Sequence, residues 1–145
     1  MEQTSVKIMQ CKTAKKGQMT VDCIGVGVGV IFFDRAKKVG VGLHVLAPRS
    51  ASPSPPNPPK FADSGVLYAI DMLIKEGALA NPVIAIAGGA AMEGAPAGFS
   101  MGIKVVEAVK EALSKAKFNI FKEETGGSKI RSILLDIETG QISIK

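Results

Sequence analysis

Residues 25–34 read GVGVGVIFFD, and after a short charged turn residues 38–48 read KVGVGLHVLAP. Both stretches consist mainly of valine and other strand-forming residues, and glycine recurs in them at every second position. This pattern is typical of two adjacent strands joined by a hairpin. We therefore expect one long strand over residues 20–33 and its hairpin partner over residues 39–46, so that a β-sheet forms the centre of the fold.

The glycines of the first stretch create a strand face without side chains. With a period of two, Gly25, Gly27 and Gly29 share one face, where another backbone or a substrate can approach closely. We expect a pocket that is lined by Gly25, Gly29, Gly88 and Gly89. The glycine run is not a phosphate-binding loop, because the Gly-x-Gly-x-x-Gly spacing is absent and more strand follows it.

Two helices are predicted from apolar residues at helical spacing. The first covers residues 63–76, with Asp63 or Ser64 as N-cap and Gly77 at its end. Its predicted buried stripe comprises Val66, Leu67, Ile70, Leu73 and Ile74. The second helix begins after Ser100 as N-cap, and its predicted buried stripe comprises Val105, Val106, Val109, Ala112, Leu113 and Ala116.

The remaining segments complete a layered domain. Further strands are predicted over residues 6–12, 82–87, 118–121, 132–136 and 141–144. Six prolines between residues 48 and 59 predict an extended surface loop, which we interpret first as a rigid connector. Binding to a proline-binding domain and a place at the rim of a site beside the strand over residues 39–46 are the alternatives. The fold class is therefore α+β, with layered, sandwich-like mixed sheets and two main helices. The length of 145 residues suits a single domain, 1–145, that needs neither disulfides nor metals.

The composition excludes several classes of function. The net charge is +5, but the lysines are scattered and no aromatic side chains stand among them to stack on bases, so no nucleic-acid binding is expected. No apolar run reaches the roughly 20 residues of a membrane span, and no signal peptide is readable, which predicts a cytoplasmic protein without membrane insertion. One histidine and two cysteines cannot close a zinc site, so no metal is expected.

His44 is the single histidine and the candidate catalytic residue. In an amidohydrolase with a cysteine nucleophile, an imidazole accepts the thiol proton and later protonates the leaving ammonia. Cys11 and Cys23 are expected to be reduced and buried as small apolar side chains. Along an unbroken strand Cys23 would lie about 13 Å from Gly27, too far for one histidine to serve both positions. Without a thiolate beside it, His44 would at most activate water.

In order and spacing, short motifs across the chain resemble the CheD family of chemoreceptor glutamine deamidases. The strand pair resembles the family's Gly-x-Gly-Ser-Cys-Val-Gly-Val strand and the histidine strand that follows it. Elsewhere the matching motifs are KFAD at 60–63, IAGGAAM at 86–92, ETGGS at 124–128, Arg131, and TG at 139–140. The resemblance implies a CheD-like α+β cysteine-hydrolase fold with the helices outside, hydrolysis of receptor glutamine amides without a cofactor, and a chemoreceptor or a CheC-type phosphatase as partner.

The departures from the family pattern fall on its catalytic set. By the resemblance, Gly27 occupies the position of the nucleophilic cysteine, Val21 that of the catalytic threonine, and His44 alone keeps the family residue. The resulting hypothesis is a CheD-like chemotaxis protein, a pseudoenzyme that retains the scaffold and binding surfaces but has lost cysteine-dependent deamidation. Two alternatives stay open: an interaction protein outside chemotaxis that reuses the fold, and an active protein-glutamine deamidase that uses His44.

Overall fold

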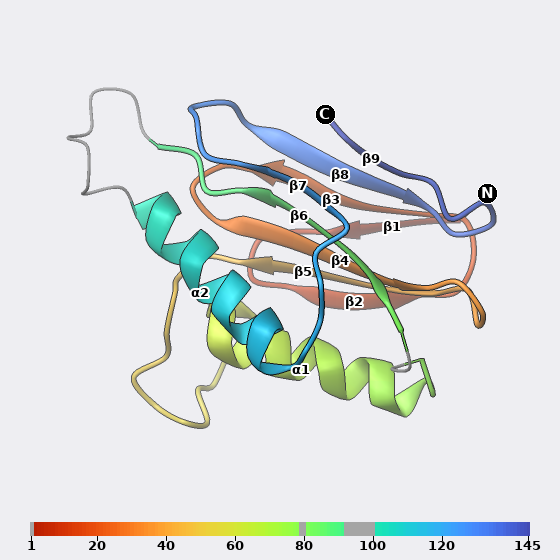
Figure 1. Ribbon diagram of the computed structural model, residues 1–145, viewed down its shortest axis with the longest axis horizontal. Coiled ribbons are helices and arrows are strands. Elements are labelled where there is room, and N and C mark those ends of the chain that lie inside the picture. Colours follow the sequence, from red (N-terminus) through yellow and green to blue (C-terminus); the bar gives the residue numbers. More distant parts are fainter. Residues whose placement is uncertain (1, 79–80, 92–100) are drawn as a thin grey trace.

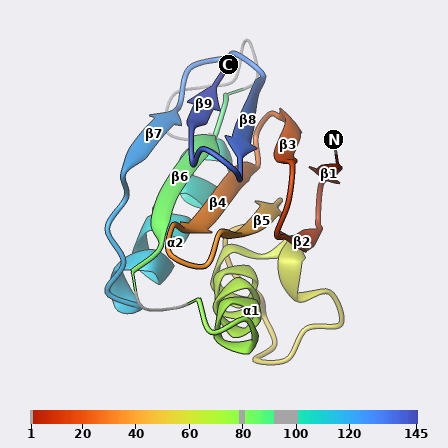
Figure 2. The same ribbon diagram turned by 90° about the vertical axis from the view of Figure 1, so that its right-hand side faces the viewer.

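A computed structural model describes residues 2–78, 81–91 and 101–145. Two sheets lie face to face, and two helices cover the outer side of one of them (Figures 1 and 2). In spatial order, the four-stranded sheet contains β1 (Gln3–Val6), β3 (Gln18–Ile24), β8 (Arg131–Asp136) and β9 (Ile142–Ile144). The five-stranded sheet contains β2 (Cys11–Ala14), β5 (Val39–Val45), β4 (Val28–Asp34), β6 (Val83–Gly88) and β7 (Lys122–Thr125). The helices are α1 (Ala62–Lys75) and α2 (Met101–Lys115), and a 3₁₀ turn, η1, spans Pro58–Lys60.

The layers confirm the α+β class with mixed sheets and outer helices. Parallel pairs (β1 with β3, β6 with β7) occur beside antiparallel ones. One hydrophobic core lies between the helices and the five-stranded sheet, and the other lies between the two sheets. Every residue of β4 and β5 is buried, because this hairpin is covered on both faces. Such central strands read as continuous apolar runs, which is why the hairpin was recognisable in the sequence.

The predicted long strand over residues 20–33 is wrong. The chain bends at residues 25–27, so that β3 pairs with β8 in one sheet while β4 pairs with β5 and β6 in the other. The alternating valines continue through the bend because both flanking strands face buried layers. The predicted strand over residues 6–12 is also divided, into β1 and β2, at a turn in which Met9 has φ +63°.

The predicted strand over residues 118–121 is wrong as well, since the last strand of the five-stranded sheet begins at Lys122. Phe118 packs edge-on against Phe32 at a centroid distance of 6.2 Å. This contact holds the segment after α2 over the core, so strand pairing starts only beyond it. The strands over residues 39–46, 82–87, 132–136 and 141–144 are confirmed within two residues at each end.

The first helix confirms only part of its predicted buried stripe: Val66 and Leu73 are buried, and Ile70 packs against the core. Its buried residues are Ala62, Gly65, Val66, Ala69 and Leu73, whereas Leu67 and Ile74 are 67% and 54% exposed. The reason is the close approach at Gly65, where an added Cβ would meet the Val45 side chain at 2.9 Å. That contact turns the helix about its axis and moves Leu67 to the outside.

The helix ends agree only in part with prediction. Phe61 is the N-cap of α1 and makes no side-chain cap hydrogen bond; the Asp63 carboxylate instead accepts from the backbone N–H groups of Ser64 and Ser50. Gly77, with φ +67°, ends the helix as expected. Ser100 lies outside the described residues. No helix in the described part of the chain is long and apolar enough to cross a membrane.

The proline-rich segment between β5 and α1 is anchored at both ends. The backbone N–H groups of Leu46 and Ala47 donate to the Lys60 carbonyl at 2.8 and 2.9 Å, and Ala47 forms a β-bridge with Phe61. Pro55 and Pro59 are buried. These contacts support the connector interpretation of the segment.

Candidate functional site

His44 lies on β5 with its side chain directed between the two sheets. Residues of a strand alternate between its two faces, so Gly40 and Gly42 are on the same face of β5 as His44. This face points toward the four-stranded sheet. A Cβ on Gly42 would meet the side chains of Val6 and Met19, which belong to that sheet. His44 is 1% exposed, so its imidazole is enclosed in the layer between the sheets.

The backbone of His44 is held by the turn between β1 and β2. Its N–H donates to the Gln10 carbonyl at 3.0 Å, and its carbonyl accepts from the Met9 N–H at 2.8 Å. On its other side His44 is the Cα partner of Gly29 in β4. Because the polar backbone groups of His44 point toward the turn, this is a non-hydrogen-bonded pair, in which opposing side chains come closest. Gly29 contributes no side chain of its own beside the imidazole.

Val21 fills the space over Gly29. A Cβ on Gly29 would meet Val21 Cγ1 at 2.8 Å and Ile24 Cδ1 at 2.5 Å. The fold thus gathers Val21, Gly29 and His44 in one place, although they come from three different strands in two sheets. An alkyl side chain at residue 21 offers the imidazole no hydrogen bond.

The other predicted glycines converge at the same end of the sheets, in the bend between β3 and β4. The Gly27 carbonyl accepts from the Gly89 N–H at 2.8 Å, and the Gly25 carbonyl accepts from the Ala90 N–H at 3.0 Å. A Cβ on Gly27 would lie far inside van der Waals contact of the Val45 carbonyl oxygen, next to His44. Gly88 is equally crowded by the Gly27 carbonyl. Closely packed backbones therefore occupy this region, and its use as a pocket stays a prediction.

Gly126 and Gly127 also belong to this cluster, which was not predicted from the sequence. The Gly126 N–H donates to the Gly88 carbonyl at 2.9 Å, and the Ala91 N–H donates to the Gly127 carbonyl at 2.7 Å. Arg131 reaches the same Gly88 carbonyl from β8 at 3.4 Å. The repeated Gly-Gly pairs at 88–89 and 126–127, all with positive φ, were the available signal for this contact.

Neither thiol is placed to act with His44. Cys11 is the partner of Leu43 in β5 and packs with its sulfur 3.4 Å from that of Met72 in α1, on the helix side of the sheet and hence opposite His44. Burial raises the pKa of Cys11 to about 12, so it stays a thiol near neutral pH.

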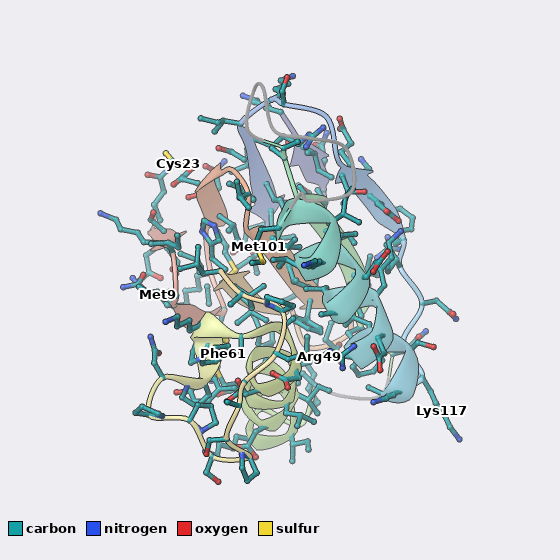
Figure 3. All side chains as sticks on the ribbon, turned by 90° about the vertical axis from the view of Figure 1, so that its left-hand side faces the viewer. Met9, Cys23, Arg49, Phe61, Met101 and Lys117 are labelled. Atoms are coloured by element: carbon teal, nitrogen blue, oxygen red, sulfur yellow. The ribbon has the colours of Figure 1, made fainter. Side chains whose placement is uncertain are left out.

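The expectation that Cys23 is buried is wrong. Cys23 is exposed, has φ +55° and sits where the register of β3 against β8 shifts between Val21 and Ile24. The bulge turns its side chain outward, while Val21 and Ile24 on either side of the bulge stay in the core. Figure 3 shows Cys23 at the edge of the molecule, directed away from the sheets.

Burial also determines the protonation state of His44. It lowers the pKa of the imidazole from 6.5 to about 4, because the charged form loses its hydration. Nδ1 is buried and has no hydrogen-bond partner among the described residues. His44 is therefore neutral at pH 7 and a weak base, far from the pKa near the working pH that favours general-base catalysis.

In the described ranges, no group of three or more His, Cys, Asp or Glu side chains is placed to hold a metal ion. The candidate site thus consists of His44, the alkyl wall of Val21 and Ile24, and a cluster of packed glycine backbones.

Comparison with known proteins identifies the scaffold. The family model described as CheD chemotactic sensory transduction matches residues 46–145. The chain belongs to the CheD family. The matched residues begin two positions after His44 and so include neither Gly27 nor His44.

Relatives of this CheD protein align over more of the chain. The probable chemoreceptor glutamine deamidase CheD of Methanococcus vannielii is 32% identical over 142 residues, which cover 97% of this chain and 92% of the relative. The protein of that name from Desulforamulus reducens is 37% identical over 127 residues, or 84% and 76% of the two chains. The chemoreceptor glutamine deamidase CheD of Thermotoga maritima is 37% identical over 123 residues, or 84% and 77%.

Proposed function

We propose that this protein is a non-catalytic member of the CheD family that acts in chemotaxis by binding a partner protein. The observation that carries the proposal is Gly27, which stands at the position assigned to the nucleophilic cysteine. Its α-carbon is closed in by the Val45 carbonyl, so no side chain fits there in the present backbone. A cysteine-dependent deamidase needs a thiolate within reach of its histidine, and neither Cys11 nor Cys23 supplies one.

Two further observations support the loss of catalysis. Val21 stands at the position assigned to the threonine and gives His44 nothing to hydrogen-bond. The pKa of His44, about 4, makes the imidazole too weak a base to activate water efficiently at neutral pH. These points favour a binding function over an active deamidase that uses His44.

The partner in this proposal is a chemoreceptor, since the relatives named above are chemoreceptor glutamine deamidases. A CheC-type phosphatase is the second candidate partner, and either would place the protein in the cytoplasm. Membership of the CheD family favours chemotaxis over an unrelated interaction role.

We expect the unmodified protein to bind chemoreceptor fragments without converting glutamine to glutamate. Mass spectrometry of receptor fragments after incubation measures conversion, and biolayer interferometry on the same fragments measures binding. The Thermotoga maritima relative serves as a positive control for deamidation. Glutamate formation that disappears in His44→Ala would overturn the loss of catalysis. Absence of both binding and conversion, with an active positive control, would overturn the receptor partner.

A further inference from the structure

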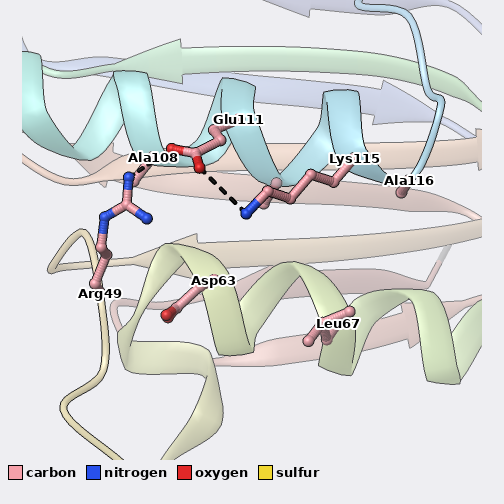
Figure 4. Close-up of a pocket in the computed structure, with 8 residues that line it drawn as sticks. Arg49, Asp63, Leu67, Ala108, Glu111, Lys115 and Ala116 are labelled. Atoms are coloured by element: carbon pink, nitrogen blue, oxygen red, sulfur yellow. Dashed lines mark hydrogen bonds and ion pairs between the residues drawn. The ribbon is translucent and has the colours of Figure 1, made fainter. Parts of the chain in front are cut away.

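A groove runs between the two helices on the face of the molecule opposite His44. α1 and α2 lie side by side there, and Arg49 from the proline-rich segment reaches the rim (Figure 4). A cavity of about 240 Å³ is lined by Leu67 of α1, by Ala108 and Ala112 of α2 and by Ala116 directly after that helix, with charged residues at its edge. A second cavity, of about 590 Å³, shares Leu67 and Ala116 with the first. The two cavities therefore form one continuous groove.

The floor of the groove is apolar and only partly open to solvent, since Ala112 and Ala116 are half-buried and Ala108 is buried. The three alanines follow each other at intervals of four residues along α2 and the turn after it, so they lie in line on one face and leave room that longer side chains would fill. Opposite them, the Leu67 side chain is 67% exposed, although burial of a leucine side chain is energetically favourable. Ile70 of α1 and Phe118 extend the apolar lining into the second cavity.

The arrangement of the groove suits a helix. The first cavity, of about 240 Å³, has room for one or two apolar side chains, and the second, of about 590 Å³, continues the row of places toward Phe118. A groove between two helices with a row of such places is the form that receives an amphipathic helix, whose apolar anchors recur at i, i+3 or i+4, and i+7.

The charges at the rim favour an acidic occupant. Arg49, Lys115 and Lys117 line the groove against Asp63 and Glu111, a surplus of one positive charge. Glu111 pairs with both Arg49 and Lys115, and Lys117 has no ion pair within the described residues. With a net charge of +5 on the whole chain, a second copy of the protein would be repelled, whereas an acidic partner would be attracted.

We propose that this groove is a docking site for an acidic amphipathic helix of a partner protein. Leu67, Ala112 and Ala116 receive its apolar anchors, and Arg49, Lys115 and Lys117 face its acidic flanks. The groove is separated from His44 by the five-stranded sheet, so docking does not depend on the proposed function of the Gly27–His44 region.

The test uses a fluorescent peptide of about 18 residues, with leucines at helical spacing and glutamates on its flanks, and a counterpart with lysines in place of the glutamates. Fluorescence anisotropy with the full chain is expected to show binding of the acidic peptide only. Leu67→Glu should weaken binding about tenfold or more, and Lys115→Glu should weaken it and flatten its salt dependence. Tyr68→Glu is the matched control, because it adds the same charge to the next, 43% exposed residue of α1, outside both cavities.

Each variant is checked by its thermal unfolding curve, and backbone NMR shifts of Ala112 and Ala116 report where the peptide lies. Equal binding of both peptides, equal effects of Leu67→Glu and Tyr68→Glu, or shifts confined to other residues would overturn the proposal. Self-association that Leu67→Glu abolishes would assign the groove to a second copy and overturn it too. Unchanged peptide binding by His44→Ala would separate this result from the test of the proposed function.

Discussion

Gly27→Ala is expected to lower the stability of the protein far more than Gly25→Ala, two residues earlier in the same bend. The added Cβ at residue 27 would overlap the Val45 carbonyl oxygen, whereas at residue 25 it would meet no atom within 4 Å. Neither glycine has a positive φ, so the two substitutions differ in contacts and not in backbone strain. Overpacking of this kind typically costs about 1–3 kcal/mol, and more when backbone must move.

The measurement is the thermal unfolding temperature of the two variants and the unmodified chain. We expect the unfolding temperature of Gly27→Ala to be several degrees below that of the unmodified chain. In domains somewhat longer than this one, each kcal/mol of lost stability lowers the unfolding temperature by about 2–4 °C. Gly25→Ala should stay near the unmodified protein or slightly above it, since alanine restricts the unfolded chain. Similar melting temperatures for both variants would show that the bend has room for a side chain, and the argument from Gly27 would then fail.

The same contact bears on whether a cysteine at residue 27 could give deamidase activity. Gly27→Cys adds the Cβ of alanine and a sulfur, so the bend must move before the thiol can face His44. We therefore expect this single substitution to give a destabilised protein without deamidase activity. His44-dependent glutamate formation by Gly27→Cys would show instead that the scaffold lacks only its nucleophile.

The sequence predicted those elements whose pattern and environment agree. The β4–β5 hairpin was predictable because both of its faces are buried. All residues of its two strands other than His44, Asp34 and the glycines are therefore apolar. α2 was predictable for a related reason: its apolar stripe follows one face, and Val105, Val109 and Leu113 are buried there.

The features that were not predicted from the sequence depend on tertiary contacts. The bend at residues 25–27 was missed because valine and glycine alternate on both sides of it, so periodicity does not show where the chain passes from one sheet to the other. The facing of α1 was missed because Gly65, which has no hydrophobic signal, fixes it through its approach to Val45. The apolar groove was missed for the same reason, since the prediction assigned its exposed residue Leu67 to the core.

The candidate site was gathered from the family resemblance and not from periodicity. Periodicity placed His44 and Gly29 on neighbouring strands, but it gave no reason for Val21, in the other sheet, to lie over Gly29. That neighbourhood depends on how the sheets stack. The exposure of Cys23 depends on a bulge, which the apolar surroundings of that residue in the sequence did not indicate.

Acidification is expected to destabilise the protein through His44. Burial lowers the pKa of His44 from 6.5 to about 4, so between these values the unfolded chain takes up a proton that the folded chain does not. Stability attributable to this residue is complete above about pH 6.5, falls as the pH decreases toward 4, and then levels off. At about 1.4 kcal/mol per pKa unit, the loss amounts to roughly 3 kcal/mol.

His44→Leu isolates this contribution from the 13 aspartates and glutamates that titrate in the same range. Leucine is apolar and similar in size, and it removes a buried nitrogen that has no partner among the described residues, so little stability should be lost at pH 7. Urea unfolding at pH 7, 6, 5 and 4.5, on both proteins, should therefore show a steeper decline for the unmodified chain. Because His44 is the single histidine, its NMR signal can be followed directly, and it should not titrate above about pH 5. If the His44 signal titrates near pH 6.5 and stability declines equally with pH in the two proteins, the imidazole is solvated. The non-catalytic proposal would then lose one of its supports, the enclosed and neutral His44.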